Sequence, residues 1–241
     1  MKRKHPLQVE SIIKNYKKHR VLNNVSLKID EGEIYSLVGL NGIGKTTMIK
    51  IILGLTKADK GVVKLFGKDI EASKDVRQKI CYLPEKFTPS AFLKGHEFLS
   101  ICTGYYGKKY DKDEAAVLCN ELDFNPEDLE KKISTYSKGM SQKLGLISIF
   151  LTGAPLLILD EPMSGLDPNA RIYLKRKLKK YKQAGNSIFF TSHILADIEE
   201  ICDRISILHN GTLHYEGDVP KLIKLKKTPN LEQAFLSVIS E

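Results

Sequence analysis

The sequence predicts an α/β fold in which the strands of a largely parallel sheet end in polar residues at one edge. The apolar run 34–38 leads through a glycine-rich turn into a helix that starts near residue 46. The run 156–159 ends in Asp160 and Glu161, and the run 187–192 ends in His193. Because parallel strands present their carboxyl ends at one edge of a sheet, where α/β proteins bind ligands, these polar ends indicate a functional site.

The glycine-rich turn carries the most specific pattern in the chain. It reads G-x-x-x-x-G-K-T, in which backbone N–H groups close round an anion at the positive end of a helix. Lys45 is expected to reach the β- and γ-phosphates of a nucleotide, and the Thr46 hydroxyl to ligate a bridging Mg²⁺. The predicted nucleotide-binding residues of this loop are Gly39, Leu40, Asn41, Gly42, Ile43, Gly44, Lys45, Thr46 and Thr47.

Two adjacent carboxylates close the apolar run at 156–159. Since side chains alternate along an extended strand, Asp160 and Glu161 are expected to point to opposite sides and to have different roles. Asp160 suits the Mg²⁺ shell, and Glu161 suits the activation of an attacking water. An alternative, in which the acids only cap the turn before Pro162, remains open from this stretch alone.

Two further residues have both a structural and a functional interpretation. Tyr16 stands just before the basic turn 17–20, where it either packs on the core as a strand-end aromatic or stacks on a purine. His193 ends an apolar strand, as many structural histidines do. Its place beside the phosphate loop and the paired acids in the predicted sheet equally favours a functional role.

The chain is long enough for one large domain, with 241 residues of which 42% are hydrophobic. Short alternating strands are expected before residue 30, as an antiparallel β subdomain. The stretch from about 89 to 152 changes to helical spacing and is interpreted as an all-helical subdomain inserted into the α/β core. Residues 211–241 are expected to form a hairpin and helices, and the four scattered cysteines indicate free thiols.

Charge and hydropathy limit the classes of function. The longest uncharged run, 144–159, is shorter than the roughly 20 residues of a membrane-spanning helix and contains Gly153 and Pro155. No export signal follows the basic start. The net charge of +9 is compatible with nucleic acid or with an anionic membrane surface. Much of the excess lies in 171–182, where apolar residues at helical spacing favour a solvated surface helix over a nucleic-acid patch.

With these motifs in this order, together with Ser137-Lys138-Gly139-Met140, the chain resembles the ATPase subunit of an ATP-binding cassette (ABC) transporter. The resemblance covers nearly the whole length and implies a P-loop NTPase core that uses ATP and Mg²⁺. It implies that Tyr16 stacks on adenine, that Glu161 is the catalytic base and that His193 touches the γ-phosphate. It also implies that Ser137 and Gly139 contact the γ-phosphate of a second subunit and that Asp167 signals across that dimer.

The chain departs from the family's usual pattern at two places. The signature Leu-Ser-Gly-Gly-Gln is here Tyr136-Ser137-Lys138-Gly139-Met140, which keeps the serine and the second glycine. The linking-loop glutamine is replaced by Glu85, whose carboxylate is also a hard oxygen ligand for Mg²⁺. Both variants resemble the branch that serves drug, antibiotic and polysaccharide exporters.

The leading hypothesis is therefore an ATPase that drives a separate integral-membrane permease, an exporter, from the cytoplasmic face of the membrane. Phe87, Phe92 and Leu93 are expected either to line a groove for the permease or to belong to the helical core. The competing hypothesis is a soluble cassette protein that acts on nucleic acid or the ribosome. One phosphate loop and the lack of sustained heptads disfavour it, so a nucleic-acid partner is not expected.

Overall fold

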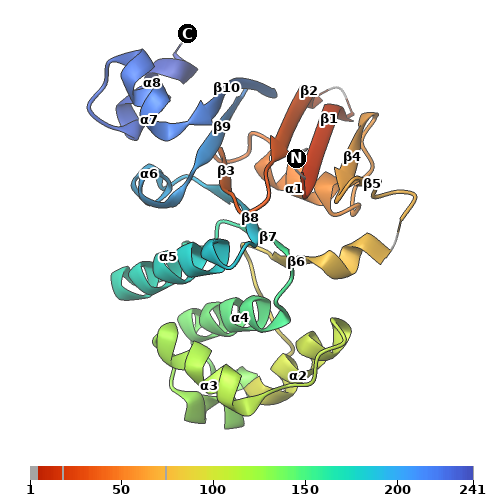
Figure 1. Ribbon diagram of the computed structural model, residues 1–241, viewed down its shortest axis with the longest axis vertical. Coiled ribbons are helices and arrows are strands. Elements are labelled where there is room, and N and C mark those ends of the chain that lie inside the picture. Colours follow the sequence, from red (N-terminus) through yellow and green to blue (C-terminus); the bar gives the residue numbers. More distant parts are fainter. Residues whose placement is uncertain (1–4, 18, 74, 241) are drawn as a thin grey trace.

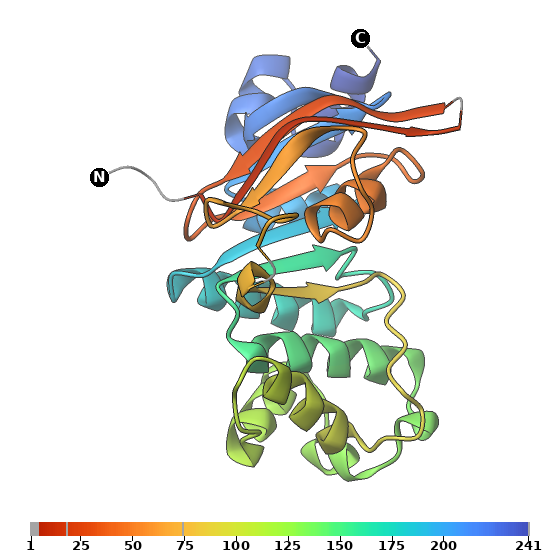
Figure 2. The ribbon, with the colours of Figure 1, turned by 90° about the vertical axis from the view of Figure 1, so that its right-hand side faces the viewer.

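Two sheets and a group of helices form the chain, whose computed structural model describes residues 5–17, 19–73 and 75–240. The helices of segment 95–152 gather at one end of the long axis, and both sheets lie toward the other end (Figure 1). Figure 2, turned by 90°, shows the antiparallel sheet, the core sheet and the helices of segment 95–152 one after another along the long axis.

The first sheet is antiparallel and has the strand order β2-β1-β4-β5. Its strands are β1 (Leu7–Tyr16), β2 (His19–Ile29), β4 (Lys60–Leu65) and β5 (Lys68–Asp69). The alternation of apolar residues before residue 30 therefore marks two long strands, which are joined by the basic turn. Lys18 in that turn lies outside the described residues.

The second sheet is the core sheet, with the order β10-β9-β3-β8-β7-β6. Its strands are β3 (Ile34–Val38), β6 (Ile80–Leu83), β7 (Leu156–Asp160), β8 (Ser187–Ser192), β9 (Arg204–His209) and β10 (Thr212–Asp218). All neighbours are parallel except β9 and β10, which form the hairpin whose return strand was expected from residue 211. The predicted α/β architecture is confirmed.

Helices flank the core sheet and fill the segment between β6 and β7. The α-helices are α1 (Lys45–Ile52), α2 (Gly95–Tyr105), α3 (Lys112–Glu121), α4 (Lys138–Thr152), α5 (Pro168–Gln183), α6 (Leu195–Ile201), α7 (Val219–Lys226) and α8 (Leu231–Ile239). Short 3₁₀ helices are η1 (Asp75–Lys79), η2 (Pro126–Glu130) and η3 (Ile133–Thr135). The Asn230 side chain caps α8 by accepting a hydrogen bond of 3.0 Å from the Gln233 N–H.

Strands β3, β7 and β8 of the core sheet are buried on both faces, which is why they are largely apolar runs. Along β7, Leu157 and Leu159 belong to the apolar cluster shared with the helices of segment 95–152 and with α5. Leu156 and Ile158 belong to the other cluster, which includes α1 and the antiparallel sheet. Side-chain alternation on one strand thus joins the two halves of the molecule.

No helix in the described part of the chain is both long enough and apolar enough to cross a lipid bilayer. Among these residues all four cysteines are free, with Cys81 and Cys119 buried, and Cys102 and Cys202 half-buried.

Candidate active site

The phosphate loop connects β3 to α1 and depends on glycine for its shape. Gly42 and Gly44 have φ angles of +82° and +115°, which favour glycine. A Cβ on Gly39 would lie 2.7 Å from the carbonyl oxygen of Leu208 on β9. Helix α1 begins at Lys45, one residue earlier than expected, so its free N–H groups and positive dipole end face the loop.

Lys45 is buried at the start of α1 and its ammonium turns back over the loop. Its Nζ donates hydrogen bonds to the carbonyl oxygens of Gly39 at 2.7 Å and Leu40 at 3.2 Å. It also lies 3.4 Å from Oε1 of Glu161. The cation is therefore held at the mouth of the loop, where an anion would meet it.

Asp160 ends β7 and is bound through both carboxylate oxygens. Oδ2 accepts a hydrogen bond of 3.0 Å from the Thr46 hydroxyl, and Oδ1 accepts one of 2.6 Å from the Thr191 hydroxyl. The hydroxyl of Thr46 and the carboxylate of Asp160 are hard oxygen ligands for a metal ion and lie side by side. This donor set fits Mg²⁺.

The expectation that Asp160 and Glu161 point to opposite sides is wrong, because Glu161 has left the strand conformation. Its φ angle is +50°, and its N–H donates to both the carbonyl and the hydroxyl of Thr191 at 3.1 Å. Side-chain alternation therefore stops at Asp160. Both carboxylates face the loop, and Oε1 of Glu161 is a buried atom that accepts no hydrogen bond among the described residues.

His193 follows β8 and closes the other side of Glu161. Its Nδ1 lies 2.8 Å from Oε2 of Glu161, and its backbone N–H donates to the same oxygen at 3.3 Å. The imidazole is half-exposed, whereas the carboxylate is buried. The ring therefore faces the cavity from the solvent side.

These groups line one cavity of about 370 Å³. Its lining comes from the phosphate loop, the segment after β6 and the ends of β7 and β8. The residues are Asn41, Gly42, Gly44, Lys45, Thr46, Thr47, Glu85, Lys86, Asp160, Glu161 and His193. Four separate stretches of sequence thus meet at the carboxyl edge of the sheet, as expected for parallel strands.

Seven predicted site residues lie outside this lining in the described chain: Gly39, Leu40 and Ile43, which belong to the phosphate loop itself, and four residues from more distant segments. Tyr16 ends β1 with 46% of its surface exposed, and the Lys14 ammonium lies 5.2 Å from its ring centre. Ser137 caps α4 by accepting from the Met140 N–H at 3.1 Å, and Gly139 is in the first turn of that helix. Asp167 caps α5 and accepts from the Ala170 N–H at 2.9 Å.

Thr191 contacts both acids of the site, although it is not among the residues predicted from the sequence. Its hydroxyl accepts from the Glu161 N–H and donates to Asp160, so it orients both acids from the neighbouring strand. A polar residue two positions before His193 in an apolar strand was the available signal. Lys86, which also lines the cavity, follows Glu85 and had no pattern to mark it.

Comparison with known proteins agrees with this geometry. The profile of the family described as ABC transporter matches residues 22–164, which is more than half of the chain. This chain belongs to the ABC transporter family. The resemblance inferred from the motifs is thereby confirmed.

This ABC transporter chain aligns with its relatives over most of its own length. An uncharacterized ABC transporter ATP-binding protein of Synechocystis is 38% identical over 84% of this chain, which spans 58% of that relative's length. A bacitracin transport ATP-binding protein of Enterococcus faecalis is 34% identical over 90% of this chain, and the match spans 71% of that relative's length. A solved ATP-binding subunit of an ABC transporter superposes with a TM-score of 0.90 at 31% identity, covering 96% of this chain and 98% of that one.

Proposed function

We propose that this chain is the ATP-binding and ATP-hydrolysing subunit of an ABC exporter and drives a separate membrane permease. One observation carries the proposal: Lys45, Thr46, Asp160, Glu161 and His193 line a single cavity although they come from three distant parts of the chain. Each has the chemistry that phosphoryl transfer from ATP to water needs.

The phosphate loop binds the ATP. Loop N–H groups and the positive end of α1 hold the β- and γ-phosphates, and the Lys45 ammonium moves from its carbonyl partners to the phosphate oxygens. Thr46 and Asp160, with Glu85 of the same cavity lining, would hold Mg²⁺, which would supply charge neutralisation at the phosphates.

Glu161 then acts on the attacking water. Oε1 accepts no hydrogen bond among the described residues, and the Lys45 ammonium at 3.4 Å is the group that moves to the phosphate, so Oε1 is then free to accept a proton. Oε2 is held by His193, which fixes the carboxylate and places an imidazole beside the γ-phosphate position. Thr191 keeps both carboxylates in place through its hydroxyl.

A second subunit completes the site. The cavity is open on one side, and phosphoryl transfer needs donors round the γ-phosphate with water excluded. Ser137, Gly139 and Asp167 lie at the N-termini of α4 and α5, outside the cavity of their own chain. In the proposed dimer they face the ATP of the other subunit, and Tyr16 stacks on the adenine.

The permease binds an apolar groove between the core sheet and α2. This groove of about 500 Å³ includes Phe87, which packs on Phe98, and the exposed side chains of Ile101 and Tyr105. In the described chain Phe92 and Leu93 are not among its lining residues, although Phe92 is 90% exposed. The permease therefore contacts Phe87 and α2, and not Phe92 and Leu93, at the cytoplasmic face of the membrane.

The competing function on nucleic acid receives no support from the basic helix α5. Lys177 and Lys180 both bind Glu121 of α3, and Lys175 binds Asp197 and Glu200 of α6. These ammonium groups are already paired within the chain. They tie α5 to its neighbouring helices instead of forming a free cationic surface.

The test measures phosphate release by the purified chain with Mg²⁺ and ATP. We expect turnover that Lys45→Ala abolishes and that Lys50→Ala, an exposed change on the same helix, preserves. Turnover that persists in Lys45→Ala would contradict the proposed site. Turnover that rises only when RNA or DNA is added would favour the competing function.

A further inference from the structure

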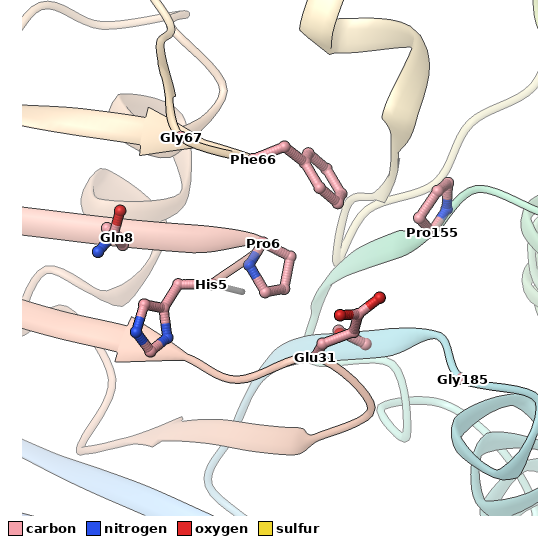
Figure 3. A pocket seen from close by; sticks show the side chains of 9 residues that line it. His5, Pro6, Gln8, Glu31, Phe66, Gly67, Pro155 and Gly185 are labelled. Carbon is pink, nitrogen blue, oxygen red and sulfur yellow. The ribbon is translucent and has the colours of Figure 1, made fainter. Parts of the chain in front are cut away.

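A second cavity, of about 360 Å³, lies at the opposite edge of the core sheet (Figure 3). Its lining includes Glu31 just before β3, Pro155 just before β7 and Ser187 at the start of β8. These are the amino ends of the same strands whose carboxyl ends lead to the active site. The two cavities are therefore separated by the length of the sheet.

Two proline rings and one phenyl ring line this cavity, together with the imidazole of His5. Pro6 precedes β1, Phe66 lies in the turn between β4 and β5, and Pro155 precedes β7. Figure 3 shows these rings round a common space, with Gly67 and Gly185 at its margins, where no side chain intrudes. Apolar ring surfaces from segments next to both sheets thus meet here, as in pockets that bind small molecules with aromatic rings.

Phe66 occupies a position that local backbone preference disfavours. It forms a two-residue turn with Gly67, and the φ angles of the pair are +50° and +78°. Asn-Gly is the favoured pair in such turns, and a bulky residue with positive φ costs on the order of 1 kcal/mol or more. The conformation is held by a hydrogen bond of 3.0 Å from the Phe66 N–H to the Pro6 carbonyl. The turn therefore places an aromatic ring at the cavity against its own preference.

Glu31 supplies the charge of the cavity. It lies in the turn between β2 and β3, is exposed, and in Figure 3 its carboxylate points toward the space between the rings of Pro6 and Pro155. Within the described ranges no ion pair or hydrogen bond involves this carboxylate. The Lys79 ammonium, 5.4 Å from the centre of the Phe66 ring, is not one of the lining groups.

We propose that this cavity is a binding site for a small planar organic cation. The aromatic ring of the ligand lies among Phe66, Pro6 and Pro155, and its cationic group pairs with Glu31. Such a ligand satisfies the carboxylate and is attracted to the face of the phenyl ring. It contacts segments of both sheets at once, because Phe66 lies in the turn between β4 and β5 and Pro155 lies just before β7.

The probe is benzamidine, with benzamide as its uncharged isostere. Titration is followed by the backbone amide signals in ¹H–¹⁵N NMR spectra of the intact chain. We expect shifts confined to residues round the cavity, Phe66 and Gly67 first, with a dissociation constant on the order of millimolar for a ligand of this size. Benzamide is expected to bind about tenfold more weakly, because it does not pair with Glu31.

Two variants separate binding from folding. Phe66→Asn keeps the turn, since Asn-Gly is its preferred pair, but removes the stacking surface. Glu31→Gln keeps the shape and removes the charge. Each is expected to weaken benzamidine binding about tenfold or more, whereas Glu232→Gln, an exposed change on α8, leaves it unchanged.

The proposal is overturned by any of three results. These are no shifts at millimolar benzamidine, equal affinity for benzamide, or shifts centred on the phosphate loop instead of the turn between β4 and β5. Binding that survives Phe66→Asn in a folded chain would equally reject it.

Discussion

Nδ1 of His193 lies 2.8 Å from Oε2 of Glu161, while Oε1 of the same carboxylate lies 3.4 Å from the Lys45 ammonium. The acid is thus held between a ring on one strand end and a cation on the phosphate loop. Its two oxygens have different neighbours, and this difference defines which of them is available to a water molecule.

Glu161→Gln is expected to bind ATP but to hydrolyse it about 10² to 10⁴ times more slowly. The amide keeps the size of the side chain and its contact with His193, but it cannot accept a proton from water. The measurement is steady-state phosphate release together with equilibrium ATP binding. A variant that turns over within a few-fold of the wild type would mean that another group is the base.

Thr191→Val is expected to raise the Mg²⁺ concentration needed for half-maximal ATPase activity by about 10- to 100-fold. The valine removes the hydrogen bond of 2.6 Å to Asp160, while the Glu161 N–H keeps the Thr191 carbonyl as a partner. Thr191→Ser retains the hydroxyl and serves as the matched control. If both variants need the same Mg²⁺ as the wild type, the hydroxyl does not orient Asp160.

A heterodimer of a Lys45→Ala subunit with a Ser137→Arg subunit is expected to regain one tight ATP site. In a shared arrangement both defects fall in one site, and the other site combines an intact loop with an intact signature. Bound ATP is counted in a Glu161→Gln background, with the two mutant homodimers as controls. Recovery of no site would show that each site is built within one chain.

The double variant Ile101→Ser, Tyr105→Ser is expected to lose its binding to the permease and to keep the fold of the wild-type chain. These side chains are 60% and 62% exposed, so their removal takes little from the core. Val117→Ser, at 58% exposure on α3 and outside the groove, is the matched control. The fraction recovered on cell membranes should fall for the double variant alone, at an unchanged melting temperature.

Transport, the ATPase activity of the isolated chain and its melting temperature together separate the two interpretations of Phe87 and Leu93. Serine at both positions is expected to uncouple transport and spare the isolated ATPase if they serve the permease groove. A collapsed melting temperature would instead identify them as core residues. Leu93 packs against the apolar cluster of the helices, and Phe87 contacts both that cluster and the groove.

Glu121→Gln is expected to lower the melting temperature at pH 7 by about 1–3 °C. Partial burial raises the pKa of Glu121, but hydrogen bonds from Lys177 and Lys180 outweigh it and leave the pKa below 4.5. The ionised carboxylate therefore stabilises the fold above that value, and the contribution is lost as the pH falls through the lowered pKa. Thermal melts from pH 7 to pH 3 should converge for the two proteins, while Glu232→Gln matches the wild type throughout.

The sequence by itself determined the phosphate loop, the apolar strands and the polar residues that end them. These features depend on local rules: glycine where φ is positive, a lysine at a helix start, and continuous apolar runs where a strand is covered on both faces. The edge at which Lys45, Asp160 and His193 meet follows from the same rules, because parallel strands share their carboxyl edge.

Only the tertiary structure decided the side to which Glu161 points, since its φ of +50° comes from hydrogen bonds to Thr191 on a neighbouring strand. The role of Thr191 was hidden for the same reason, because its partners are 30 and 31 residues away along the chain. The cavity beside Phe66 brings together residues from both sheets that no local pattern connects. Contacts between distant segments depend on how the sheets pack, and the periodicity of a single strand does not encode that packing.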